Sequence, residues 1–151
     1  MSKKPEIEDI VWCNSLATRK VSRRITQIYD AALAPSGIRS TQLVILASLH
    51  LRGKNPFTLS KLADQLVLDR SALGHNLRPL ERDGLIELQE NENDRRQRYL
   101  VLTKAGKAKL QEAFPLWAKA QETFTKLYGE NEMAALRQTL LTIAHDERLP
   151  K

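Results

Sequence analysis

The organisation of the chain follows from one central segment, TLSKLADQLVLDRSALGHNLRPLERDGLI, which spans residues 58–86. Its first part predicts a short helix over 59–66, because apolar residues recur at helical spacing and Thr58 is a suitable N-cap. Its second part predicts a longer helix, with Asp69 as the N-cap and Gly84 as the residue that ends it. Two helices joined by a turn of about three residues are typical of a helix-turn-helix.

Two short runs with alternating apolar and polar residues follow, at 85–90 and 97–102, on either side of a polar stretch at 91–96. This arrangement predicts a β-hairpin with a polar tip. The centre of the chain is therefore expected to be a helix-turn-helix followed directly by a hairpin.

Helical patterns flank this central part on both sides. Apolar residues recur at spacings of three, four and seven over 7–33, and Pro35 and Gly37 then break the pattern. A second helix is expected over 40–51, apolar on more than one side. The remainder is again helical in pattern, and Pro115 is expected to bend it. We therefore expect a mainly α fold with a small β-hairpin.

The composition restricts the class of protein. At 151 residues the chain suits a single domain, 1–151, with a core of its own. The single cysteine excludes an intrachain disulfide, and three dispersed histidines offer no zinc site, so we expect no metal and no cofactor. No signal sequence and no apolar run of about 20 residues is found, so we expect a cytoplasmic protein without a membrane partner.

A net charge of +6 favours a nucleic-acid partner but does not locate the contact. Residues 52–103 carry nine basic and eight acidic side chains, so what matters is where these charges point. On a helical wheel Leu73, Leu77 and Leu80 share one side of the second helix. The opposite side carries polar and basic residues, and a further arginine starts the helix: Ser71, His75, Arg78 and Arg82, with Arg70.

This outward face is the candidate DNA contact, because a helix fits the major groove and an arginine can bind guanine O6 and N7. A plain solvated face is the alternative, since charged outer faces are common on soluble helices. The short turn before the helix and the hairpin after it favour the DNA contact. Pro79 is expected to kink the helix or weaken its last turn. The acidic residues nearby are Glu81, Asp83, Glu87, Glu90 and Glu92. Their side chains would repel phosphates, which confines the DNA contact to this face of the helix and to the hairpin tip.

Three runs of sequence resemble the recognition-helix exit and wing of the MarR family of regulators: LERDGLI at 80–86, DRR at 94–96 and LVLT at 100–103. Together with the flanking helices, the resemblance covers nearly the whole chain. It implies a winged helix-turn-helix lobe over 39–103 and dimerisation helices over 7–33 and 106–147. It also implies a homodimer, each lobe of which meets one half-site of a pseudo-palindromic operator in double-stranded DNA.

For the wing, the resemblance implies that Asp94 holds the guanidinium of Arg96, which enters the minor groove at the tip. An arginine is favoured there because a narrow minor groove has an enhanced negative potential. Arg95 and Arg98 are assigned either to phosphates or to solvent.

The implied function is that of a sequence-specific transcriptional regulator, a repressor released by a small-molecule or redox signal. An architectural DNA-binding protein without sequence preference is the alternative, and a footprint would distinguish the two. The sequence gives little support for an enzymatic function, because no glycine-rich phosphate loop and no hydrolase or metalloprotease motif is found. No catalytic residue is assigned.

Two kinds of input signal are considered. Small aromatic effectors bind MarR regulators between the dimer helices and the lobe. The candidates for such a pocket are Trp12, Tyr29, Phe114 and Trp117. The alternative is that they belong to the core, because an aromatic stripe at helical spacing is more often buried than part of a ligand site. Some relatives sense oxidants through a cysteine in the first helix, which makes Cys13 a candidate. Redox sensing is not favoured, because a free cysteine is usually a small buried apolar residue and no cluster of positive charge lies beside this one.

Overall fold

The computed structural model describes residues 4–53, 55–91 and 94–149, and the side chains of Arg95 and Arg96 lie outside the described part. The elements, in which η marks a short 3-10 helix, are η1 Ile7–Trp12, α1 Asn14–Leu33, η2 Ala34–Ser36, α2 Ser40–Arg52, β1 Phe57–Thr58, α3 Leu59–Leu66, α4 Arg70–Arg82, β2 Ile86–Asn91, β3 Asp94–Leu102, α5 Lys104–Tyr128 and α6 Glu130–Ala144. The expected class, mainly α with a small β-hairpin wing, is confirmed.

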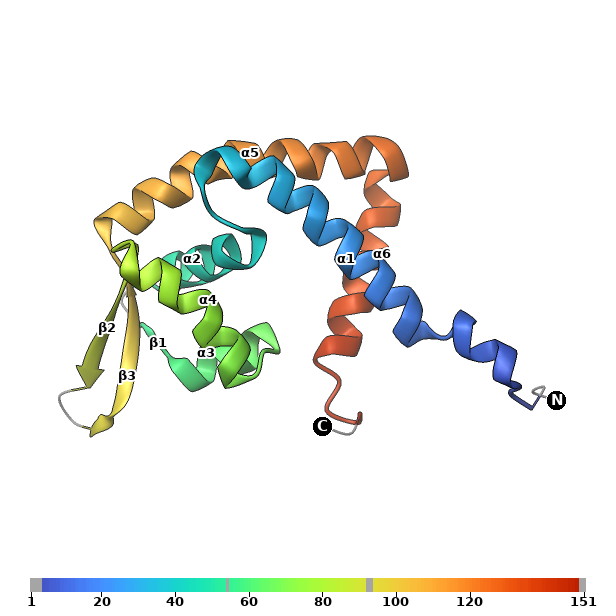
Figure 1. Cartoon of the computed structure of the whole chain (residues 1–151), viewed down its shortest axis with the longest axis horizontal. Helices are drawn as coiled ribbons and strands as arrows, with labels where there is room; N and C mark the ends of the chain where they lie inside the picture. The colour runs from blue at the N-terminus through green and yellow to red at the C-terminus, as the bar shows by residue number, and fades with distance from the viewer. Residues whose placement is uncertain (1–3, 54, 92–93, 150–151) are drawn as a thin grey trace.

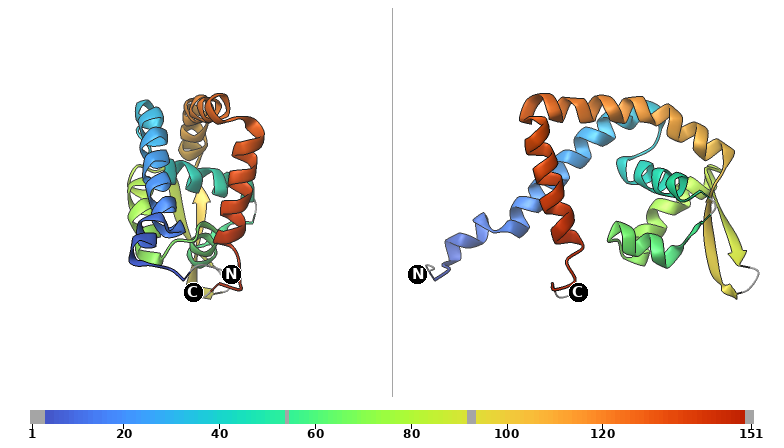
Figure 2. Two further views of the ribbon diagram at one scale, coloured as in Figure 1. Left: turned by 90° about the vertical axis from the view of Figure 1, so that its right-hand side faces the viewer. Right: turned by 180° about the vertical axis from the view of Figure 1, so that it is seen from behind.

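The helices outside the lobe form an open frame (Figure 1). Helix α5 runs along the top of the molecule, α1 packs beside it, and α6 turns back from its far end. The lobe formed by α2 to β3 lies below the other end of α5, with the wing on its outer side. The views in Figure 2 show that η1 and the N-terminus lie at the end of the molecule opposite the wing.

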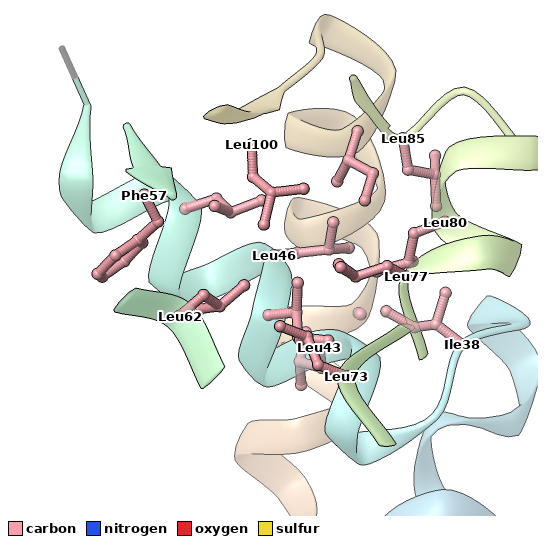
Figure 3. Packing of buried hydrophobic residues seen from close by; sticks show 14 of the residues in the cluster. Ile38, Leu43, Leu46, Phe57, Leu62, Leu73, Leu77, Leu80, Leu85 and Leu100 are labelled. Atoms are coloured by element: carbon pink, nitrogen blue, oxygen red, sulfur yellow. The ribbon is translucent and has the colours of Figure 1, made fainter. Parts of the chain in front are cut away.

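The core lies inside the lobe and is built mainly from leucine (Figure 3). Leu73, Leu77 and Leu80 of α4 are buried in it, as the helical wheel predicts. Burying one such side chain contributes about 1.5–3 kcal/mol. The same cluster contains residues of α2, α3, the sheet and the first half of α5, together with Leu33 at the end of α1 and Ile38, so the lobe packs as one unit against α5 and the end of α1.

Both predicted N-caps of the helix-turn-helix are confirmed. The Thr58 hydroxyl accepts a hydrogen bond from the Lys61 amide at 3.3 Å, and the Asp69 carboxylate accepts one from the Ala72 amide at 2.7 Å. Between the helices Val67 adopts a left-handed conformation, with φ at +52°. This conformation costs a non-glycine residue about 1–2 kcal/mol, so the packing of the two helices must hold the turn.

Helix α4 ends as predicted, but Pro79 does not interrupt it. Gly84 has φ at +69°, and the Leu85 amide donates to the Leu80 carbonyl at 2.9 Å, which is the hydrogen bond of a Schellman cap. The expected weakening of the last turn is wrong, since α4 continues to Arg82. Proline removes only one backbone hydrogen bond, and the C-cap and buried leucines hold the turn around it.

The sheet has the order β1-β3-β2, and its hairpin is longer than predicted. Residues 94–96 were expected in the tip but belong to β3, because pairing extends to Asn91 and Asp94. Strand β1 was not expected. Its two residues, Phe57 and Thr58, pair with β3 antiparallel.

The first predicted helix is wrong in one respect, since it is interrupted at Cys13. The backbone there is extended, with ψ at 154°, and this residue separates η1 from α1. Its sulfur accepts a hydrogen bond from the Leu16 amide at 3.5 Å and caps α1. An N-cap residue requires such a non-helical backbone, which apolar spacing alone does not reveal.

The wing, the end of α4 and the start of α5 meet at Thr103 and Gly106. The Thr103 hydroxyl donates to the Gly84 carbonyl at 2.7 Å and accepts from the Gly106 amide at 3.0 Å. A Cβ added at Gly106 would clash with the backbone carbonyl of Leu85. The close approach at this glycine fixes the direction in which α5 leaves the wing.

Candidate nucleic-acid interface

Helix α4 presents the predicted polar face to solvent. The five predicted residues are all exposed, namely Arg70, Ser71, His75, Arg78 and Arg82, and the acidic Glu81 is exposed on the same helix. The buried leucines on the other side fix the rotation of the helix, so the core determines which side chains face outward. Asn76 is half-buried, and its amide donates to the Ala72 carbonyl at 2.9 Å, so it serves its own helix.

The two arginines of this face differ in their surroundings. Within the described part of the chain Arg78 forms no ion pair or hydrogen bond through its side chain, so its guanidinium can bind a ligand with both edges. Arg82 is paired with the neighbouring Asp83, with Nε 2.9 Å from Oδ1. That hydrogen bond holds the pKa of the Asp83 carboxyl below its ordinary value and raises the pKa of Arg82. A contact of Arg82 with DNA must compete with this pair.

The wing supplies the second set of predicted residues. Asp94 begins β3, while the side chains of Arg95 and Arg96 are outside the described part, so their assignment stays a prediction. Arg98 is exposed on β3. The hairpin is tied across its strands, because the Asn91 amide donates to the Tyr99 hydroxyl at 3.0 Å.

The acidic residues around the interface are exposed where they are described, as at Glu81, Glu87 and Glu90, and Glu92 is outside the described residues. They therefore limit how far the contact can extend along β2.

The four aromatic residues predicted for an effector pocket are not brought together within one chain. Trp12 is exposed in η1, far from the lobe. Phe114 and Trp117 stack on each other within α5, with ring centroids 5.8 Å apart. Tyr29 stacks instead on Phe124 at 5.6 Å and donates to the Gln121 side chain, and burial raises the pKa of its phenol.

Cys13 is exposed, which corrects the expectation of a buried apolar residue. Its position between η1 and α1 explains the difference, since the thiol caps a helix end and does not pack against the core. The redox assignment itself stays a prediction.

One polar link joins the frame to the lobe, a second joins α5 to η2 within the frame, and neither was predicted from the sequence. One oxygen of the Asp30 carboxylate, on α1, accepts from the amide and the hydroxyl of Ser40, each at 2.7 Å. Lys109 of α5 donates to the Ser36 carbonyl at 2.9 Å. A signal for the first link was present, because Arg39 precedes α2 and has no acceptor with which to cap it.

Among the residues that the structure describes, no group of three or more His, Cys, Asp or Glu side chains is placed to hold a metal ion. A membrane-spanning helix is likewise not found in the described part of the chain.

Comparison with known proteins places these features in one family. The sequence model of the MarR family matches residues 38–97, from the start of the lobe into β3. The comparison with curated proteins gives no match.

Several solved structures are similar along most of the chain. The M. tuberculosis transcriptional regulator MosR, in complex with DNA, is 34% identical, with a TM-score of 0.78 and coverage of 87% of this chain and 93% of its own. A second MosR structure is 33% identical, with a TM-score of 0.72 and coverage of 86% and 96%. The transcriptional repressor CouR, bound to a 23-mer DNA duplex, is 26% identical, with a TM-score of 0.79 and coverage of 95% and 100%. The matched family model and the identity to MosR over almost its whole length show that this chain belongs to the MarR family.

Proposed function

We propose that the chain is a sequence-specific, DNA-binding transcriptional regulator that acts as a homodimer. The observation that carries this proposal is the exposed row of Ser71, His75 and Arg78 on a helix whose other side is locked in the core. A helix held in this way can enter the major groove with its base-reading side chains outward. The solved DNA complexes of MosR and CouR support the same partner. Double-stranded DNA as the partner places the action of the protein in the cytoplasm, and no enzymatic step is part of the proposal.

Arg78→Ala tests the role of α4. The side chain is exposed and unpaired in the described part of the chain, so the fold should be unchanged. Loss of a bidentate contact should cost about 1–3 kcal/mol of discrimination at one base pair. Equilibrium binding to duplexes that differ at single positions measures this. If the variant keeps the base preferences of the wild type, Arg78 is not a base-reading residue.

For the wing, the proposal assigns Arg96 to the minor groove, Asp94 to its orientation and Arg95 to a phosphate. Arg96→Ala should then weaken binding to many sequences and flatten its salt dependence. If Asp94 acts only through Arg96, the double alanine variant should bind almost as well as Arg96→Ala alone. Full additivity of the two losses would contradict the orienting role.

The regions 7–33 and 106–147 are assigned to the dimer, because they expose apolar side chains that one chain cannot cover. Trp12 of η1 is 83% exposed, Leu127 of α5 is 70% exposed and Ile143 of α6 is 56% exposed. Neither η1 nor α6 has a buried residue. Patches of this kind mark interfaces, and obligate interfaces resemble a domain core cut in half.

The space between α1 and α6 supports a second copy as the partner. The two helices border an open hollow of about 600 Å³, lined by polar and basic side chains of α1 and by Ile143 of α6. A symmetric dimer can fill it with the same elements of the other subunit. This arrangement would leave the lobes, 39–103, at the two ends of the dimer, each free to meet one half-site.

The proposal also includes regulation, in which the protein acts as a repressor and a signal releases it from DNA. An aromatic effector would bind where the frame meets the lobe, close to Tyr29, Phe114 and Trp117, with Trp12 brought there by the dimer. CouR, described as a repressor, has also been solved with p-coumaroyl-CoA. Cys13 offers an exposed thiol for a redox signal. Addition of an aromatic acid or of peroxide to the DNA complex should release the DNA, and a complex that resists both would leave the signal proposal without support.

A further inference from the structure

A cavity of about 640 Å³ lies between the helix-turn-helix and the wing. Its walls are formed by Thr58 of β1, the first turn of α3, the first turns of α4 and the middle of β3. The two helices and β3 each contribute one cation, namely Lys61 of α3, Arg70 of α4 and Arg98 of β3. The sequence pattern assigns no role to Lys61, and it assigns Arg98 either to a phosphate contact or to solvent.

The charge of this cavity has one sign. Among the described residues that line it, Lys61, Arg70 and Arg98 are the charged ones, and none is acidic. Around it, residues 52–103 carry nearly as many acidic as basic side chains, so the excess is local. Within the described part of the chain none of the three cations forms an ion pair, whereas Arg82 nearby is paired. Three positive charges around one cavity whose described lining has no acidic side chain favour an anion there.

Two features of the backbone keep the cavity open. Strand β1 has only two residues, which pair with Leu100 and Tyr99 of β3. At Arg98 the β1 side of strand β3 is therefore not covered by β1, and this edge of β3 faces α3. On α4, Gly74 has no side chain, and a Cβ there would meet nothing within 4 Å. The Ser60 hydroxyl, which is exposed, adds a neutral hydrogen-bond donor to the cations.

The position of the cavity points to its occupant. Arg70 and Gly74 are one turn apart on α4 and line it, while Ser71, His75 and Arg78 form the adjacent outward face. When that face reads base edges in the major groove, the sugar-phosphate strand at the border of the groove passes beside α4. Phosphate contacts of this kind fix the register of a protein on DNA and do not read its sequence.

We infer that this cavity seats a backbone phosphate of the operator, held by Lys61, Arg70 and Arg98. The inference rests on the proposed function, since it needs α4 to lie in the major groove. Lys61 and Arg98 are then positioning residues, because they fix the depth of α4 in the major groove relative to the depth of the wing in the minor groove.

The test uses the full chain and a fluorescent duplex that contains the site preferred by the wild type. Lys61→Gln and Arg98→Gln should each weaken binding at every sequence by a similar factor, and each should reduce the slope of log K against log salt by about 0.9. Base preferences should stay as in the wild type, unlike those of Arg78→Ala. Lys4→Gln, which removes one exposed positive charge outside both the lobe and the dimer regions, is the matched control and should leave the slope unchanged.

Duplexes with a single uncharged methylphosphonate identify the phosphate itself. The wild type should lose affinity when one particular phosphate of each half-site is neutral, and the Lys61→Gln/Arg98→Gln variant should lose less at that position, because only Arg70 still holds that phosphate. If the wild type prefers its site but the two variants keep its salt slope, or if no phosphate shows this coupling, the inference is wrong. If the wild type shows no preferred site, the proposed function itself fails.

Discussion

Leu140→Asp combined with Ile143→Asp should convert the proposed dimer to monomers and lower its affinity for a palindromic duplex by at least about 100-fold, or about 3 kcal/mol. The two side chains are 38% and 56% exposed in the single chain, so the fold of the lobe loses little. In the dimer they would be buried, and an unpaired carboxylate buried at an apolar interface is strongly unfavourable. Sedimentation velocity at micromolar concentration and fluorescence anisotropy measure the two effects.

The matched control places the same two charges at polar positions of the same helix, as Thr139→Asp with Thr142→Asp. Both threonines are exposed, so this variant should remain a dimer and keep most of its affinity. A wild-type chain that sediments as a stable folded monomer would overturn the assignment of 7–33 and 106–147. A double Leu140 and Ile143 variant that remains dimeric would remove α6 from the interface.

Gly106→Ala should lower the free energy of unfolding by about 3 kcal/mol. The added Cβ would clash with the Leu85 carbonyl and with the Leu102 side chain, 2.6 Å away. A backbone carbonyl cannot move aside as a flexible side chain can, and the hydrogen bonds of Thr103 fix the same junction. Thermal and urea unfolding of the dimer measure the loss.

Gly74→Ala is the control for that substitution, because it makes the same chemical change inside a helix with no atom within 4 Å of the new Cβ. Alanine is the better helix former, so this variant should gain about 0.5–1 kcal/mol. Equal effects of the two substitutions would mean that the contact at Gly106 does not hold the wing to α5.

The helix-turn-helix could be predicted in detail because its signals are local. Thr58 and Asp69 cap helices that begin within one turn of them, and leucine spacing on α4 gave the buried side correctly. The weakening of the last turn that Pro79 suggests does not occur, because the C-cap and the buried leucines hold that turn, and such packing is not encoded by local spacing.

Elements that depend on distant partners were predicted less well. Strand β1 exists only because Phe57 and Thr58 meet β3, and two residues carry no pattern of their own. Residues 94–96, which were expected in the hairpin tip, belong to β3 because the pairing of β2 with β3 extends to Asn91 and Asp94. The cavity bordered by Lys61 and Arg98 is a further case, because its walls come from two helices and two strands whose proximity no local spacing encodes.

Selection of bound duplexes from a random pool, at physiological salt, tests the central claim most directly. The account predicts enrichment of one two-fold symmetric site by the wild type, with half-site centres about 34–36 Å apart, and a changed base at one position in each half-site for Arg78→Ala. Bound duplexes with no common sequence, competing equally with random DNA, would show an architectural DNA-binding protein and contradict a sequence-specific regulator.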